Sequence, residues 1–275
     1  MSSAASPPVI AARGLRVNYG SREVLYGIDL EVTRGETVVT LGGSGSGKST
    51  LLRTLVGLEK PSGGEVLVKG TDLARATDRE LDALRKKIGL SFQGGALIGS
   101  MTVGENIALP LLEHSDLAPS TIEVMVRIKL EQVGLSGFEH FSPAQLSGGM
   151  KKRAGLARAL AMDPEILFFD EPSAGLDPII AAGIDKLILD LKQVFDMTIV
   201  VVTHELASAF LIADRMVMID KGNIIALGTK EEMRANQNPR VRHFLDRVPD
   251  DEAASELDYL QRLSVGEKKK SKAKG

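Results

Sequence analysis

The 275-residue chain contains no cysteine and no long apolar run, and its positive and negative charges almost balance. Without cysteine, neither a disulfide framework nor a thiolate metal site is available, which fits a reducing compartment. The longest apolar stretches, such as residues 199–202, have the length of a strand and fall far short of a membrane span. Residues 1–8 are small and polar, without the apolar segment of a secretory signal. We therefore expect any association with a membrane to run through a partner or through the protein surface.

The net charge of −2 gives the chain no general attraction to nucleic acid. Apolar residues make up 43% of the chain and charged residues 25%, which is ordinary for a globular protein. The length suits one large α/β domain, alone or with an appendage. Lysine is concentrated at residues 268–274, which indicates either a solvated tail or a weak attraction to anionic lipid or nucleic acid.

Residues 42–50 form a glycine-rich loop between an apolar stretch at 37–41 and a helical one that begins at Lys48. In this setting the glycines let successive backbone N–H groups surround phosphates at a helix N-terminus. Lys48 then reaches the terminal phosphates, and Ser49 can offer its hydroxyl to Mg²⁺. The pattern predicts a binding site for ATP or GTP, formed by Gly42, Gly43, Ser44, Gly45, Ser46, Gly47, Lys48, Ser49 and Thr50.

Strand-like and helical stretches alternate along the chain. We expect strands at 9–19, 24–32, 37–41, 65–69, 88–92, 166–169, 198–202, 216–219 and 224–227. Helices are expected at 48–56, at 78–87 with Asp78 as the N-cap, and at 179–195. Ile122, Val126 and Leu130 recur at helical spacing, which predicts a helical insertion within residues 102–137. Because the stretches at 166–169 and 198–202 are almost wholly apolar, they are typical of buried parallel strands, and the fold class is α/β.

Two carboxylates, Asp170 and Glu171, follow the apolar stretch at 166–169. Ligands of an open α/β sheet bind at the carboxyl ends of its strands, so Asp170 can meet a metal there. Mg²⁺ prefers carboxylate, phosphate and water oxygens, which suits Asp170 together with Ser49. Glu171, one residue further out, is free to polarise an attacking water. The alternative is that both carboxylates only cap the segment that follows.

A second segment of the phosphate-binding kind lies upstream, where residues 146–150 precede an amphipathic helical stretch. Ser147, Gly148 and Gly149 stand at the start of this helix, where no Cβ blocks the approach of an anion. One nucleotide needs only one such cradle. The second cradle therefore suggests that two chains share each nucleotide.

The combination of the loop at 42–50, the segment at 146–150 and the Asp170–Glu171 pair resembles the ATP-binding subunit of ABC transporters. The resemblance covers roughly residues 9–235. It implies ATP and Mg²⁺, and a P-loop NTPase fold of the ABC ATPase type, with a mostly parallel sheet, an antiparallel β subdomain and an inserted helical subdomain at about 95–160. It also implies a homodimer in which two ATP molecules lie between the P-loop of one chain and the signature motif, Ser147, Gly148 and Gly149, of the other.

The same resemblance implies roles for further residues. Gln93 matches the glutamine that senses metal and water and faces the permease, and His204 matches the histidine that contacts the γ-phosphate. Tyr19 matches the aromatic residue that stacks on adenine, although a plain strand-end aromatic is the alternative. Asp177 matches an aspartate at the dimer seam and can also cap the next helix. Met150 stands where the family usually has glutamine, and Gly175 adds flexibility beside the seam, but neither departure removes a group that does chemistry, so we expect activity.

Residues 91–98 and 103–114 are similar to the ATPase subunits of bacterial MCE-associated lipid transporters, the Mla type. This likeness implies phospholipid or a related lipid as cargo, an Mla-type permease, an MCE substrate-binding protein and possibly a small cytoplasmic regulator as partners, and a peripheral place on the cytoplasmic face of the inner membrane. The ATPase of another ABC importer, for example of amino acids, is the alternative. A soluble ABC-type ATPase acting on DNA or ribosomes is disfavoured because the chain carries one cassette and only a short insertion. A regulator without turnover is disfavoured because Lys48, Asp170, Glu171 and His204 are all present.

The domain organisation expected from the sequence has a flexible segment at 1–8, the ATPase domain at 9–248 and a C-terminal extension at 249–275. Within the extension, Ala253, Leu257, Leu260 and Leu263 form an apolar stripe at helical spacing. Such a stripe either docks back on the same chain or meets a partner subunit.

Overall fold

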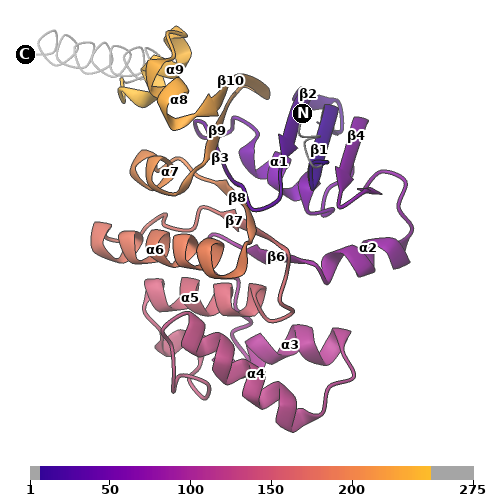
Figure 1. Ribbon diagram of the computed structural model, residues 1–275, viewed down its shortest axis with the longest axis vertical. Coiled ribbons are helices and arrows are strands. Elements are labelled where there is room, and N and C mark those ends of the chain that lie inside the picture. Colours follow the sequence, from indigo (N-terminus) through magenta and orange to yellow (C-terminus); the bar gives the residue numbers. More distant parts are fainter. Residues whose placement is uncertain (1–6, 249–275) are drawn as a thin grey trace, which may run out of the picture. The chain divides into compact units, whose positions relative to one another are not determined.

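The computed structural model describes residues 7–248 of the chain (Figure 1). The chain divides into two compact units, residues 1–235 and residues 236–275. The site-bearing elements all belong to the first unit. The predicted boundary between the ATPase domain and the extension, at 248–249, stays a prediction.

A six-stranded sheet carries the elements that lead into the predicted site. Its order is β10 (Asn223–Thr229), β9 (Arg215–Asp220), β3 (Thr37–Leu41), β8 (Thr198–Val202), β7 (Ile166–Asp170) and β6 (Ile88–Ser91). The strands from β9 to β6 run parallel, and β10 pairs with β9 in the antiparallel sense. Every residue of β3 and β8 is buried, as expected for parallel strands covered on both faces. The parallel strands therefore bring their carboxyl ends, and the residues that follow them, to one edge of the sheet.

A second, antiparallel sheet of four strands has the order β2 (Arg22–Val32), β1 (Ile10–Tyr19), β4 (Gly63–Val68) and β5 (Thr71–Asp72). Helix α1 (Lys48–Leu55) contacts β2 of this sheet and β7 and β8 of the larger one. Its side chains Leu51, Leu52 and Leu55 belong to one buried core that includes residues of both sheets. This packing fixes the start of α1, and with it the P-loop, against the central strands.

The start of helix α2 (Asp78–Arg85) differs from the prediction by one residue. Thr77, not Asp78, is the N-cap, because the Thr77 hydroxyl accepts from the backbone N–H of Glu80 while the Glu80 carboxylate accepts from the backbone N–H of Thr77. This reciprocal pair is a capping box, which satisfies two of the unpaired donors at the helix start. Asp78 is the first residue inside the helix, where the helix dipole stabilises its negative charge.

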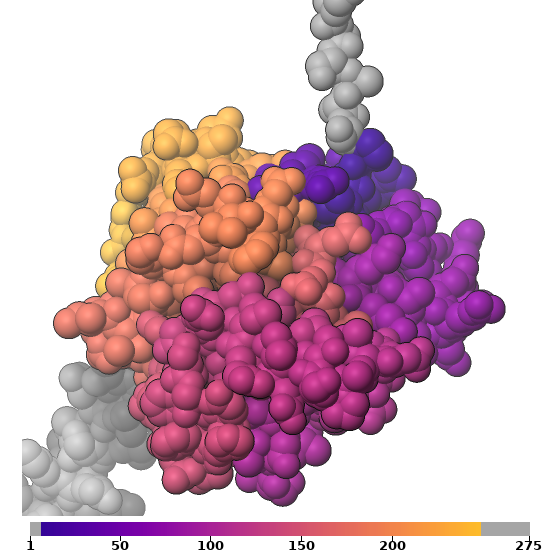
Figure 2. All heavy atoms as spheres, turned by 60° about the horizontal axis from the view of Figure 1, so that its bottom comes forward, coloured from indigo at the N-terminus to yellow at the C-terminus, as the bar shows by residue number. Residues whose placement is uncertain are grey.

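The helical insertion lies between β6 and β7 in the chain, as predicted. It comprises α3 (Val103–His114), α4 (Pro119–Gln132), the short 3₁₀ helix η1 (Pro143–Gln145) and α5 (Gly148–Ala159). The three α-helices gather at one end of the first unit (Figure 1), and Figure 2 brings this end to the front. Helix α5 also contacts β6, so the insertion is packed onto the edge of the large sheet.

The remaining helices are α6 (Pro178–Phe195), α7 (Leu206–Ile212) and α8 (Lys230–Ala235) in the first unit and α9 (Pro239–Leu245) in the second. In α9, Asn238 caps the first turn and Arg242 pairs with Asp246. None of the helices within residues 7–248 is long and apolar enough to span a membrane. The apolar stripe at 253–263 and the lysines at 268–274 lie outside the described residues.

Candidate functional site

The P-loop joins the end of β3 to the start of α1 and has one packed side and one open side. A Cβ atom on Gly42 would lie 2.2 Å from the carbonyl oxygen of Ile219, so only glycine fits there. A Cβ atom on Gly43 or Gly45 would meet no other atom within 4 Å. The open side, with its glycine backbone, is the surface that an anion can approach closely.

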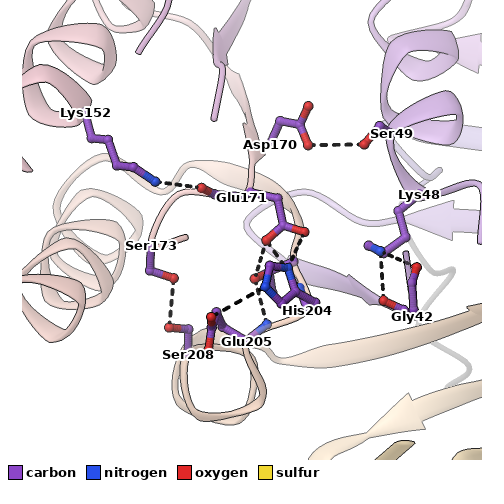
Figure 3. Close-up of polar contacts among 12 residues, drawn as sticks. Gly42, Lys48, Ser49, Lys152, Asp170, Glu171, Ser173, His204, Glu205 and Ser208 are labelled. Atoms are coloured by element: carbon purple, nitrogen blue, oxygen red, sulfur yellow. Dashed lines mark hydrogen bonds and ion pairs between the residues drawn. The ribbon is translucent and has the colours of Figure 1, made fainter. Parts of the chain in front are cut away.

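Lys48 is buried at the first position of α1, and its ammonium folds back over the loop. It donates hydrogen bonds to the carbonyl oxygens of Gly42, at 2.8 Å, and Gly43, at 2.9 Å (Figure 3). Burial lowers the pKa of the Lys48 ammonium, and the negative charges of Glu171 and Asp170 oppose this shift. The hydroxyl of Ser46 is buried nearby in the loop without a hydrogen-bond partner among the described residues. A buried cation and an unpartnered buried donor at an open glycine loop fit a bound phosphate.

Ser49 and Asp170 bring a hydroxyl and a carboxylate together from the start of α1 and the end of β7. The Ser49 hydroxyl donates to Asp170 Oδ1 at 3.4 Å (Figure 3). Burial, and next the neighbouring charge of Glu171, raise the pKa of Asp170. Within the described residues no group of three or more His, Cys, Asp and Glu side chains could hold a metal ion. The donor set fits Mg²⁺, which takes one or two carboxylates and completes its shell with phosphate and water oxygens.

Glu171 follows Asp170 and has a left-handed backbone conformation, with a φ of 52°. It is buried, with 8% of its surface exposed. Its carboxylate accepts hydrogen bonds from two directions. Oε1 accepts from the Nδ1 of His204 at 2.9 Å, and Oε2 accepts from the Thr203 hydroxyl at 3.1 Å and the His204 backbone N–H at 3.3 Å. Because an ionised carboxylate only accepts, these bonds place the imidazole proton of His204 on Nδ1. The side chain of Glu171 is thereby fixed at the edge where the P-loop also opens.

The other nitrogen of His204, Nε2, points away from Glu171 and lies 3.6 Å from a carboxylate oxygen of Glu205 (Figure 3). The imidazole is about half exposed, at 52% of its side-chain surface. His204 and Glu171 therefore form a carboxylate–imidazole pair with one buried and one accessible end. Such a pair can move a proton or orient a water molecule at the sheet edge.

The Ser-Gly-Gly segment begins α5 as predicted. Ser147 is the N-cap, and its hydroxyl accepts from the backbone N–H of Met150 at 3.3 Å. Glycine at position 149 is needed for packing within the chain, because a Cβ atom there would lie 2.6 Å from Cγ2 of Ile180 on α6. Gly149 therefore has a packing role in this chain, and the expected approach of an anion to both glycines stays a prediction. Among the described residues, no hydrogen bond or ion pair joins Ser147, Gly148 or Gly149 to the P-loop of the same chain.

Gln93 and Tyr19 are exposed, and within the described part of the chain no hydrogen bond or ion pair joins either of them to the P-loop. Gln93 lies just beyond β6, at the same sheet edge as Asp170, and its side chain makes no hydrogen bond to the part of the chain that the structure describes. Tyr19 ends β1 and is 43% exposed as a residue, and its hydroxyl donates to Glu59 at 3.2 Å. An exposed ring at a strand end is available for stacking, but the position alone assigns it no partner.

Asp177 caps α6, as the sequence allowed. Its carboxylate accepts from the backbone N–H groups of Ile179, at 3.1 Å, and Ile180, at 3.0 Å. Gly175, with a φ of 73°, lies in the turn just before it. The cap accounts for Asp177 within one chain, and its expected place at a dimer seam stays a prediction.

Two contacts of Glu171 were not foreseen from the sequence. Thr203 donates to its carboxylate, and Lys152 of α5 donates to its backbone carbonyl at 3.0 Å. A buried threonine directly before His204 was a usable signal for the first, since a hydroxyl at a strand end needs a partner. The second contact joins residues nineteen positions apart, and no local pattern indicates it.

Comparison with known proteins gives a consistent result. The family described as ABC transporter matches residues 25–174. The Escherichia coli (strain K12) protein named intermembrane phospholipid transport system ATP-binding protein MlaF is 39% identical over 242 residues, which cover 88% of this chain and 90% of that protein. The Mycobacterium leprae protein named probable ribonucleotide transport ATP-binding protein mkl is 42% identical over 237 residues, or 86% of this chain. This chain spans about two thirds of the length of that mycobacterial relative, 68%.

Among solved structures, the ATP-binding cassette MJ0796, in a dimeric post-hydrolysis state bound to ADP and Pi, is similar with a TM-score of 0.74 and 31% identity. The match covers 80% of this chain and 98% of that one. The predicted α/β architecture, with its mostly parallel sheet, antiparallel sheet and helical insertion, is confirmed.

Proposed function

The chain belongs to the ABC transporter family, and on that premise we propose that it is the ATP-hydrolysing subunit of a bacterial transporter that moves phospholipid between membranes. ATP hydrolysis is supported chiefly by the carboxylate of Glu171, which is held by hydrogen bonds and lies one residue beyond Asp170 at the sheet edge where the P-loop opens. The cargo is supported by the likeness to the Escherichia coli phospholipid transport protein along nearly its whole length.

We assign the steps of hydrolysis to the residues that the sheet edge gathers. Lys48 exchanges its bonds to the Gly42 and Gly43 carbonyls for the terminal phosphates of ATP, which compensates its burial. Ser49 and Asp170 would hold Mg²⁺, and the bound ion would neutralise charge on the phosphate oxygens. Glu171 accepts a hydrogen bond from the attacking water and takes its proton as the new bond from the water oxygen to the γ-phosphorus forms, while the bond from that phosphorus to the bridging oxygen breaks and ADP leaves. His204 is assigned to the γ-phosphate in its imidazolium form, in which Nδ1–H donates to Glu171 and the exposed Nε2–H can donate to a phosphate oxygen.

The second half of each site is supplied by a second copy of the chain. Ser147, Gly148 and Gly149 start a helix and, among residues 7–248, make no bond to the P-loop of their own chain. Their backbone N–H groups are assigned to a phosphate in trans. Tyr19 is assigned to stacking on adenine, and Asp177 to the seam between the two copies. Dimeric structures of a similar cassette support this arrangement.

The partners follow from the same reading. Gln93 and the segment after it face an integral membrane permease, which holds the homodimer at the cytoplasmic face of the inner membrane as a peripheral subunit. An MCE substrate-binding protein completes the transporter, and a small cytoplasmic regulator can bind it. The ATPase domain spans 9–248, with the helical subdomain at about 95–160, and residues 249–275 form the extension.

The names of the relatives point to two kinds of cargo. The mycobacterial relative is named for ribonucleotide transport, but this chain matches only 68% of its length, against 90% of the phospholipid transport protein. Purification of the subunit with its membrane partner, followed by reconstitution into vesicles, separates the two. We expect ATP-dependent movement of labelled phospholipid that stops in the Lys48→Ala variant. Movement of ribonucleotide with no movement of phospholipid would contradict the proposal.

A further inference from the structure

Lys152 joins the helix that begins at the signature motif to the turn that carries the catalytic carboxylate. It lies in the second turn of α5, five residues after Ser147, and its ammonium donates to the backbone carbonyl of Glu171 at 3.0 Å (Figure 3). Lys152 is half-buried. Burial lowers the pKa of its ammonium, and the charge of Glu171 opposes that shift. The side chain is therefore held in place at a charged partner rather than free in solvent.

The backbone of Glu171 is a sensitive place for such a contact. Its N–H donates to the Val202 carbonyl of β8 at 2.8 Å, which fixes one side of the residue to the sheet. Its carbonyl accepts from Lys152 and, more weakly, from the backbone N–H of Ala174 at 3.4 Å. Between these two sides Glu171 has a φ of 52°, a backbone conformation that is unfavourable for residues other than glycine. A change at the carbonyl therefore changes where the carboxylate points.

Helix α5 is also tied to the segment that follows Gln93. The guanidinium of Arg158 donates to the carbonyl oxygens of Ala96, at 2.8 Å, and Gly95, at 3.1 Å. Gly155 and Gly95 bring the two backbones into direct contact, since a Cβ atom on Gly155 would lie 2.7 Å from the Cα atom of Gly95. Helix α5 is thus fastened to this segment by direct contacts, and Lys152 is its link to Glu171.

We propose that Lys152 is a positioning residue that couples the two ATP sites of the dimer. In the proposed function, on which this inference rests, the signature motif of a chain contacts the nucleotide of its partner, whereas Glu171 acts on the nucleotide of its own chain. Closure of α5 on the partner's nucleotide carries the Lys152 ammonium with it and sets the carbonyl of Glu171. Occupation of one site then completes the catalytic geometry of the other.

The test compares Lys152→Met, which keeps length and loses the donor, with wild type in the complex with its membrane partner. We expect the wild-type ATPase rate to rise cooperatively with ATP concentration, with a Hill coefficient of about 1.5 to 2 for two coupled sites. Lys152→Met is expected to lower this coefficient to about 1 and kcat about tenfold, a change of about 1.4 kcal/mol in the barrier. ATP affinity of the single chain stays unchanged, because the P-loop does not involve Lys152.

Two further variants separate this role from a general effect of charge. Lys152→Arg keeps a donor and should retain cooperativity. Lys151→Met removes the same charge from the neighbouring position, whose side chain makes no hydrogen bond or ion pair with the described residues, and should behave as wild type. A wild-type Hill coefficient of 1, equal behaviour of the Lys152→Met and Lys151→Met variants, or weaker ATP binding by the single Lys152→Met chain would overturn the inference alone. A wild-type complex that does not hydrolyse ATP would overturn the proposed function as well.

Discussion

Replacement of Glu171 by glutamine isolates the charge of the carboxylate from its shape. The amide oxygen can occupy the place of Oε2 and keep the hydrogen bonds from the Thr203 hydroxyl and the His204 backbone N–H. The amide NH₂ then faces Nδ1 of His204, which becomes the acceptor when the imidazole proton moves to Nε2. The fold and the ATP affinity should therefore be preserved.

What the variant loses is the group that takes the proton from water. General-base help is worth about 10² to 10⁴ in rate, which corresponds to about 3 to 5 kcal/mol in the barrier. We therefore expect kcat to fall by a factor of about 10² or more. The assay is phosphate release by the purified complex at saturating ATP, together with ATP binding by the isolated chain. The dimer should also persist after ATP is added, because the step that releases it is blocked.

Glu205→Gln is the matched control. Glu205 lies 3.6 Å from Nε2 of His204 and carries the same charge next to the same imidazole, but it is partly exposed. Because even a full ion pair at an exposed site contributes about 0 to 1 kcal/mol, loss of this contact should change turnover by no more than about fivefold. If Glu171→Gln also stays within that range, Glu171 is not the proton acceptor and the assignment is wrong.

Three further outcomes are expected. Burial raises the pKa of Asp170, so its contribution to stability is greatest at acid pH and is lost as pH rises through that pKa. Asp170→Asn should therefore raise Tm at pH 7 without Mg²⁺-ATP, with the gain vanishing below the ordinary aspartate pKa of 3.8, and should abolish hydrolysis. Equal melting temperatures of the two proteins at pH 7 would contradict this reading. Thr203→Val removes one donor to Glu171 and should lower kcat about tenfold with KM unchanged, whereas Thr203→Ser should restore it; a rise in KM alone would refute it. Gly149→Ala should lower Tm because its Cβ meets a side chain of α6 at 2.6 Å, while Gly148→Ala, with a nearest atom at 3.7 Å, should not, as thermal unfolding can show.

The strands that lead to the site could be predicted closely from the sequence. β3 and β8 have the bounds that their apolar runs indicate, because both are buried on both faces and end where polar or glycine residues begin. The start of α2 was displaced by one residue, since both Thr77 and Asp78 can cap a helix and only the reciprocal bond with Glu80 decides between them. β5, with two residues, is too short to leave a periodic pattern.

The site residues themselves were indicated by motifs, but their mutual contacts were not. Glu171 meets Thr203 and His204 because β7 and β8 are neighbours in the sheet, an order that depends on packing of the whole chain. The bond from Lys152 to the Glu171 carbonyl depends on how α5 seats against the turn after β7. Such contacts join segments distant in sequence and need the three-dimensional arrangement to be seen.

The most direct test of the account concerns the sharing of each nucleotide between two chains. In the Ser147→Arg variant, the bulky cation stands at the start of α5, far along the chain from the P-loop of the same copy. We expect the isolated variant to bind ATP with wild-type affinity, while ATP-dependent dimerisation and the ATPase activity of the complex are lost. A variant complex that hydrolyses ATP at the wild-type rate would contradict the claim that the signature motif completes the site of the partner.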